Sequence, residues 1–118
     1  VELWQMRDRF DAENARKLFY WENQEYVTVS PDNCWTTLLQ HPHNGVLALI
    51  SNLNTDSRLV TLQFHLDRLG LDNRALEAVN ALTDEPIDVT ASGNISVPLD
   101  TEQWMYVWLR ARNPSDGN

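Results

Sequence analysis

The sequence predicts an all-β fold, a two-sheet antiparallel β-sandwich of about seven or eight short strands. From Val27 onward, short β-rich runs alternate with turn residues at the spacing typical of sandwiches and barrels. No helical segment of the length found between parallel strands interrupts them. At 118 residues with 42% hydrophobic content, the chain suits one compact domain with one core.

The first 26 residues differ from the rest, because they are polar and aromatic without a period of two. Asp11 is a residue type that caps helices, so we expect a short helix from it through residues 17–20. Residues 1–26 are therefore predicted to be a linker or short helix that packs on the sandwich. The sandwich itself is expected at residues 27–112, followed by a small polar tail at 113–118 that is expected to be disordered.

The first half of the predicted sandwich contains three strands. Residues 27–30 stop at a proline, and residues 34–40 and 46–52 flank the loop His41-Pro-His-Asn-Gly45, which is a hairpin signal. Residues 46–50 are apolar on both faces of a strand, so they predict a central strand covered from two sides.

The second half begins with the cleanest alternation in the chain, at residues 58–66. A tight turn or single helical turn follows at 67–71, with Gly70 supplying backbone freedom, and three short strands are expected at 78–82, 86–90 and 95–99. In the strand at 58–66, one face is expected to carry Val60, Leu62, Phe64 and Leu66, and the other Thr61, Gln63 and His65.

The closing strand, QWMYVWLR at residues 103–110, places large aromatic rings at every second position. Aliphatic side chains fit a core between two sheets, so the aromatic row is expected to face outward. The inward row is Met105, Val107 and Leu109, and the outward row is Trp104, Tyr106 and Trp108.

Several segments resemble the C-terminal β-sandwich of glycoside hydrolases, in particular glycoside hydrolase family 123-like proteins. They are RDRFDAENARKLFYWEN, NGVLALISNLNTDSRLVTLQFHLDRLGL, EAVNALTDEPIDV and ISVPLDTEQWMYVWLR. Where family members commonly read Asp-Ala-Leu-Thr-Gly-Glu, this chain has Asn80-Ala-Leu-Thr-Asp-Glu85. The resemblance implies a non-catalytic accessory domain, part of a longer parent chain whose catalytic barrel carries the acid and base carboxylates.

Three explanations remain open for the outward aromatic row. The aromatic residues of the N-terminal segment could fold over it, the catalytic barrel of the same parent chain could contact it, or an oligosaccharide could stack on it. In the last two cases Glu102 and Gln103 are neighbouring polar candidates beside Trp104, Tyr106 and Trp108. The N-terminal aromatic residues are Trp4, Phe10, Phe19, Tyr20 and Trp21.

Residues with catalytic chemistry are present, but we expect them to be structural or solvated. Glycoside hydrolysis needs one carboxyl group in a sheltered pocket, whereas the close pairs Asp84 with Glu85 and Asp100 with Glu102 fall in predicted turns. Cys34 lies at the start of an apolar strand, which favours a buried thiol over a nucleophile working with His43 or His65. His41 and His43 lack an evident third ligand, so no metal site is predicted.

Composition excludes further classes of function. The net charge of −8 disfavours nucleic acid as a partner, and the longest apolar run, of five residues, is too short for a membrane span of roughly 20 residues. Only 4 glycines and no phosphate-binding loop argue against a nucleotide cofactor, and one cysteine allows no internal disulfide. Asn94-Ile-Ser matches the glycosylation pattern, but Ser-Gly-Asn also predicts a hairpin turn.

Overall fold

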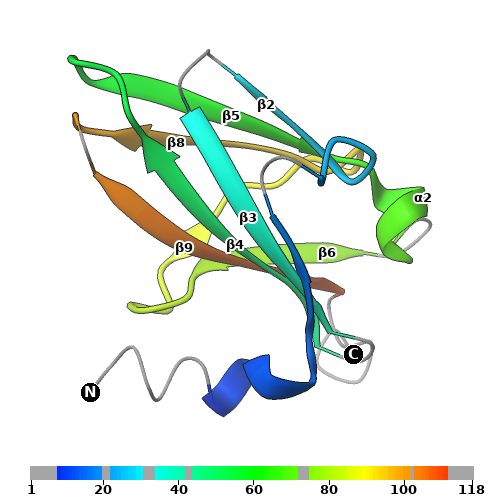
Figure 1. The fold of residues 1–118 in the computed structure, drawn as a ribbon. Helices are drawn as coiled ribbons and strands as arrows, with labels where there is room; N and C mark the ends of the chain where they lie inside the picture. Colours follow the sequence, from blue (N-terminus) through cyan, green and yellow to red (C-terminus); the bar gives the residue numbers. More distant parts are fainter. Residues whose placement is uncertain are drawn as a thin grey trace.

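The computed structural model describes residues 8–19, 22–30, 34–41, 44–71, 75–101 and 103–111. These residues form a sandwich of two antiparallel sheets, as predicted (Figure 1). The six-stranded sheet has the order β1-β3-β4-β9-β6-β7, and the three-stranded sheet has the order β2-β5-β8. The strands are β1 Arg16–Leu18, β2 Val27–Ser30, β3 Cys34–His41, β4 Gly45–Asn52, β5 Arg58–Phe64, β6 Leu76–Asn80, β7 Pro86–Ile87, β8 Asn94–Leu99 and β9 Trp104–Ala111.

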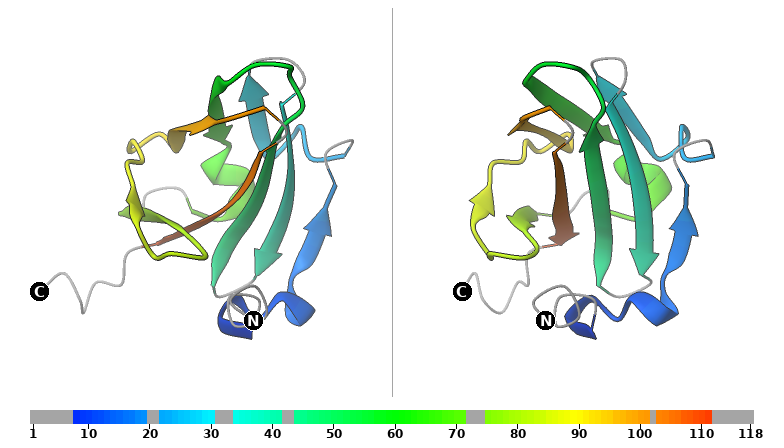
Figure 2. Two further views of the ribbon diagram at one scale, coloured as in Figure 1. Left: turned by 90° about the vertical axis from the view of Figure 1, so that its left-hand side faces the viewer. Right: turned by 60° about the vertical axis from the view of Figure 1, so that its left-hand side comes forward.

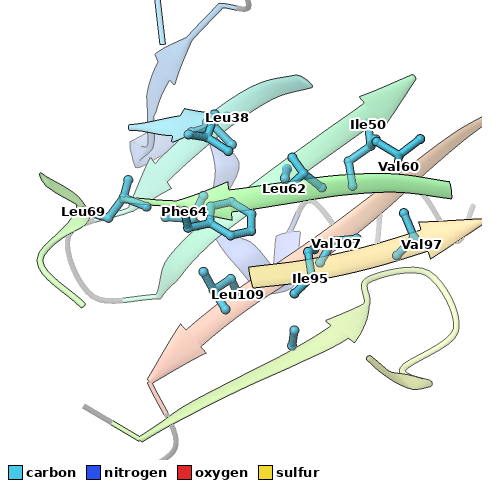
Figure 3. Packing of buried hydrophobic residues seen from close by; sticks show 14 of the residues in the cluster. Leu38, Ile50, Val60, Leu62, Phe64, Leu69, Ile95, Val97, Val107 and Leu109 are labelled. Atoms are coloured by element: carbon cyan, nitrogen blue, oxygen red, sulfur yellow. The ribbon is translucent and has the colours of Figure 1, made fainter. Parts of the chain in front are cut away.

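The main hydrophobic core lies between the two sheets, and Figure 3 shows side chains from both layers meeting there. From β9, Val107 and Leu109 are completely buried, and Met105 is half-buried against the same cluster. The inward orientation predicted for these three residues is therefore confirmed. The three-stranded sheet contributes the alternate residues of β5 and β8, which are Val60, Leu62, Phe64, Ile95, Val97 and Leu99.

Strand β4 occupies the centre of the six-stranded sheet, between β3 and β9. Its residues Val46, Ala48 and Ile50 face the core between the sheets, whereas Leu47 belongs to a second cluster on the opposite face. The apolar run at residues 46–50 thus has cover on both sides, as predicted, because each face of the strand meets a different hydrophobic cluster.

The second cluster lies on the outer face of the six-stranded sheet. It combines Phe10 and Ala12, from the segment before β1, with residues of β3, β4, β6 and β9 and the residue that follows β6. The short 3-10 helix η1, Ala12–Asn14, lies at one end of the sheet and β1 continues along its edge (Figure 2). The other members of the cluster are Leu39, Leu47, Val79, Ala81 and Trp108.

The prediction of a helix from Asp11 through residues 17–20 is wrong beyond Asn14, where the 3-10 helix ends. Arg16–Leu18 forms β1, in which Leu18 pairs with Leu38 and is buried. Burial of Leu18 in the core outweighs local helix propensity, which is a weak preference. Asp11 makes no side-chain capping bond to η1, because its carboxylate accepts hydrogen bonds from the side chain of Asn14.

The strands predicted at 78–82 and 86–90 are displaced or shorter in the structure. Strand β6 ends at Asn80, whose side-chain oxygen accepts hydrogen bonds from the backbone of Leu82 and Thr83. This side-chain turn explains why the strand stops before residue 82. Asp84 adopts the left-handed conformation with φ 63°. It lies at the position where members of the family that this sequence resembles commonly have glycine.

The predicted hairpin and helical turn are both present. Gly45 has φ 89°, and a Cβ atom there would overlap the Leu109 carbonyl oxygen, so the approach of β9 to β4 requires glycine. Strand β5 ends at Phe64, two residues earlier than expected, and Leu66–Leu69 forms the short helix α2, which Gly70 terminates with φ 73°. Within the described part of the chain, no helix has the length and apolarity to cross a bilayer.

Candidate functional site: the outer face of the six-stranded sheet

Strand pairing places the predicted aromatic row on a broader surface, the outer face of the six-stranded sheet. Trp104 and Trp35 both lie opposite Ser51 in the register, one on each side of β4. In the next row Tyr106 lies opposite Leu49. Because adjacent strands are about 4.8 Å apart, the Trp35 and Trp104 backbones are about 10 Å apart across this face.

The row is not uniform, because its Trp108 end is covered. Trp108 is 7% exposed, and the ring of Phe10 meets it edge to face with a centroid distance of 5.6 Å. Phe10 also contacts the ring of His41 edge to face, at 5.8 Å. The N-terminal segment thus occupies this end of the outer face, which removes Trp108 from any stacking surface.

Polar contacts fix the covering segment in place. The indole N–H of Trp108 donates to the backbone carbonyl of Asn44 at 2.7 Å, and the Asn44 side chain donates to the carbonyl of Phe10 at 3.0 Å. Two guanidinium groups flank the Trp108 ring, those of Arg110 at 4.6 Å and Arg9 at 5.6 Å from its centroid. The two hydrogen bonds give partners to the Trp108 indole N–H and the Phe10 carbonyl, which burial would otherwise leave unpaired.

His41, at the end of β3, joins the sheet to the segment. Its Nδ1 accepts a hydrogen bond from the Asn44 backbone N–H at 3.0 Å, so Nε2 carries the hydrogen that is donated to the Asp11 carboxylate, also at 3.0 Å. Hydrogen bonds from Asn14 and then His41 hold the pKa of Asp11 below its ordinary value. His41 therefore has a structural role, which accounts for its 8% exposure.

The opposite end of the face is open. Trp104 is 51% exposed and Trp35 41% exposed, while Tyr106 and Leu49 are half-buried beside them. The rings of Trp104 and Tyr106 meet edge to face, 5.4 Å apart and at 81° to each other. We call Trp35, Leu49, Trp104 and Tyr106 the outer patch. It is apolar, but the rings of Trp104 and Tyr106 do not lie in one plane.

The polar residues predicted beside the row have local roles or lie outside the described residues. The Gln103 side-chain oxygen accepts a hydrogen bond from the backbone of Asp100 at 2.8 Å, which stabilises the turn before β9. Glu102 lies outside the described residues, as do Trp4, Tyr20 and Trp21 of the N-terminal segment. Phe19 is 38% exposed and is not among the residues that cover Trp108.

The predicted carboxylate pairs contribute exposed side chains. Asp84 forms a surface ion pair with Arg9 at 3.2 Å, and its neighbour Glu85 is exposed. Asp100 accepts a hydrogen bond from the Ser57 hydroxyl at 2.9 Å and is also exposed. These carboxylates lack the sheltered surroundings that a general acid needs.

Cys34 and His65 contact different residues. Cys34 is buried, burial raises the pKa of its thiol, and its sulfur contacts the side chains of Asn52 and Asn54. His65 instead bonds to Thr28 and to the carbonyl of Glu25. His43, the other histidine considered beside Cys34, lies outside the described residues. Among the described residues, no cluster of three His, Cys, Asp or Glu side chains could hold a metal.

Sequence reasoning missed Trp35 and Leu49 as parts of the surface. Trp35 on β3 and Leu49 on β4 join the aromatic row only through the pairing of β4 with β9, and β9 is far from both strands in the sequence. The available signal was the alternation within residues 34–40, where Trp35 falls on the opposite face from Cys34 and Thr36.

Two packed antiparallel sheets, with an N-terminal segment over the outer face of the larger one, define a β-sandwich domain. The chain belongs to the glycoside hydrolase 123, C-terminal domain family, whose model matches residues 1–96. Membership of this family confirms the resemblance seen in the sequence. No curated protein matches the chain in sequence.

Solved structures with a similar fold include several glycoside hydrolases. An α-amylase from Anoxybacillus matches 95% of this chain with a TM-score of 0.60 and 14% identity. A GH27 β-L-arabinopyranosidase from Geobacillus stearothermophilus matches 84% with a TM-score of 0.57 and 14% identity. A maltogenic α-amylase from Thermotoga neapolitana matches 92% with a TM-score of 0.56 and 17% identity. The matched regions are 21%, 20% and 24% of those chains, so this chain spans about one fifth to one quarter of their length.

Proposed function

We propose that this domain is a non-catalytic accessory module that packs through the outer patch against the catalytic barrel of the same parent chain, a glycoside hydrolase. The family and the fold support an accessory role. The exposed positions of Asp84, Glu85 and Asp100 support the absence of catalysis, since glycoside hydrolysis requires a carboxyl group in a sheltered pocket.

The observation that carries the proposal is the division of the outer face into a covered end and an open end. A C-terminal domain is joined to its catalytic domain through its own N-terminal segment. Here that segment is fixed over Trp108 by Phe10 and Asp11, on the same sheet face that exposes Trp104 and Trp35. A catalytic domain held close to this face would bury the outer patch, and aromatic residues are enriched in such contacts.

Saccharide binding is the second candidate, favoured by the half-exposed ring of Trp104. Two features weaken it. The perpendicular rings of Trp104 and Tyr106 offer one edge and one face, and Trp108 is buried beneath Phe10. A sugar ring could therefore stack on Trp104 or Trp35, but it could not span the three-ring row.

A binding experiment in trans tests the packing proposal. The catalytic part of the parent protein is titrated with this chain, and with its Trp104→Ala and Leu59→Ala variants. Leu59 is 62% exposed on β5 of the other sheet, so it is a matched control for the loss of an exposed apolar side chain. We expect Trp104→Ala to weaken association at least about tenfold, as for a central aromatic contact, and Leu59→Ala to have no effect. Equal effects of both variants would contradict the proposal.

Two further measurements separate the alternatives. Titration with an oligosaccharide panel, followed by tryptophan fluorescence, should give no saturable change; a change that Trp104→Ala abolishes would establish saccharide binding instead. Hydrolysis of aryl glycosides by this chain alone should remain at the background rate. Turnover that is lost in the Asp100→Asn variant would show that the domain is itself an enzyme.

A further inference from the structure

Asn44 and Gly45, where the β3–β4 turn enters β4, form the only Asn-Gly pair in the sequence. In such a pair the backbone nitrogen of the glycine attacks the side-chain amide carbon of the asparagine, because glycine has no side chain to obstruct the approach. A succinimide ring closes, and the side-chain amide nitrogen leaves as ammonia. Water then opens the ring to aspartate or isoaspartate. The reaction needs no other co-reactant, so its rate depends on how freely Asn44 moves.

The fold holds Asn44 through its backbone and its side chain. The backbone N–H donates to His41 Nδ1 at 3.0 Å, the carbonyl oxygen accepts from the Trp108 indole N–H at 2.7 Å, and the side-chain amide donates to the Phe10 carbonyl at 3.0 Å. Ring closure brings the side-chain carbon of Asn44 onto the Gly45 nitrogen, so it competes with the hydrogen bond to Phe10. Because Phe10 belongs to the N-terminal segment, deamidation requires that this segment first move away.

The products of the reaction do not fit the closed arrangement. Aspartate at position 44 replaces the amide donor with a carboxylate, which would face another acceptor, the Phe10 carbonyl oxygen. Isoaspartate adds a carbon to the main chain beside Gly45, where a Cβ atom would already overlap the Leu109 carbonyl oxygen. Either product therefore loses the hydrogen bond to Phe10 and holds the N-terminal segment less firmly.

The guanidinium groups beside Trp108 already have carboxylate partners. Arg9 pairs with Asp84 at 3.2 Å, and Arg110 pairs with Glu77 at 2.9 Å. A new carboxylate at position 44 would have to take one of these groups from its present partner, so an exchange of partners adds little stability.

From these contacts we infer that Asn44 is a deamidation site gated by the N-terminal segment. The reaction proceeds in the minor population of molecules in which Phe10 has left the outer face, and its product disfavours the return of Phe10. Because ammonia is lost, the change is not reversed. The domain thereby passes once from a form with Trp108 covered to a form with Trp108 exposed. This inference does not depend on which partner packs against the outer patch.

Peptide mass spectrometry of the 118-residue chain, incubated in mildly alkaline buffer, measures the rate of deamidation at Asn44. Phe10→Ala should react at least about tenfold faster than the natural chain, since the rate follows the population of the open state. Leu62→Ala is the matched control, because Leu62 is buried in the core on the other sheet and its loss destabilises the fold without touching the segment. It should react more slowly than Phe10→Ala. Equal rates in the two variants would mean that Asn44 reacts only after global unfolding, which would overturn the gating.

A second measurement keeps Phe10 in place and introduces the product directly. In Asn44→Asp, labelled with 5-fluorotryptophan, the fluorine solvent isotope shift should show that Trp108 is more exposed than in the natural chain. Gln63→Glu adds the same charge at an exposed position on β5 of the other sheet, and should leave Trp108 protected. Equal protection of Trp108 in Asn44→Asp and Gln63→Glu would overturn the inference, because deamidation would then not release the segment.

Discussion

Phe10 and Trp108 meet edge to face, with ring centroids 5.6 Å apart and ring planes at 83°. One residue precedes the first strand and the other lies in the last, so their contact closes the N-terminal segment over the outer face of the sheet. Phe10 is completely buried, although it lies outside the core between the sheets. This contact divides the aromatic row into a structural end and an exposed end.

Replacement of Phe10 tests how firmly the segment is held. Phe10→Ala should lower the free energy of unfolding by about 3 to 4 kcal/mol, because it empties a buried ring site. Phe19→Ala is the matched control, since Phe19 is 38% exposed and its loss should cost less than about 1 kcal/mol. Urea unfolding of both variants gives the comparison, and similar losses would show that Phe10 is not an anchor.

A comparison of two glycines with positive φ can show whether a position needs glycine for lack of space or for the backbone conformation alone. Gly45 and Gly70 both have positive φ, but a Cβ atom at Gly45 would overlap the Leu109 carbonyl oxygen and lie 2.9 Å from the Arg110 Cα, whereas nothing lies within 4 Å at Gly70. Gly70→Ala should cost about 1 kcal/mol, from the left-handed conformation alone.

Gly45→Ala should cost more than about 3 kcal/mol, because β9 must also move away from the hairpin. The same unfolding measurements check this difference. Equal costs at the two positions would mean that the close approach of β9 to β4 is not needed for stability.

The Asp11 carboxylate makes the covering segment sensitive to acid. The pKa of Asp11 is lowered by hydrogen bonds from Asn14 and His41, so the folded state favours the ionised form. Its stabilisation is fully present above the ordinary pKa of 3.8 and is lost as the pH falls through the lower pKa of the folded protein.

The difference in unfolding free energy between the natural chain and Asp11→Asn should therefore be smaller below about pH 4 than at pH 5. Asparagine is the appropriate replacement, because Asp11 has φ 63° and asparagine tolerates this conformation. A difference that is unchanged down to pH 3 would contradict the role of the carboxylate.

Cys34 should be unreactive in the folded protein. The thiol is buried and its pKa is raised by that burial, so little nucleophilic thiolate forms at neutral pH. A disulfide reagent such as DTNB should modify it fully in denaturant and only slowly in the native state at pH 7. Rapid native modification would indicate an exposed or activated thiol.

The sandwich could be predicted because alternation reports directly on burial. The orientation of Val107 and Leu109 and the double cover of β4 both follow from the spacing of apolar residues. Strand β1 was not predictable in this way, since three residues are too few to show a period. Leu18 is buried only because it meets Leu38, a partner 20 positions away.

The candidate site was predicted in part. The sequence placed Trp104, Tyr106 and Trp108 on one face, but spacing alone does not reveal that Phe10 covers the last of them. Trp35 belongs to the same surface because its strand, β3, pairs with β4. Contacts between distant segments, which depend on register, are the information that local pattern does not contain.

The most direct test of the packing proposal compares the solvent exposure of Trp104 and Trp35 in this chain and in the whole parent protein. Both proteins are labelled with 5-fluorotryptophan, the resonances are assigned with single Trp→Phe variants, and the fluorine solvent isotope shift is measured. We predict that both residues are exposed in the 118-residue chain and protected in the parent, with Trp108 protected in both. Equal exposure of Trp104 and Trp35 in the two proteins would contradict the account.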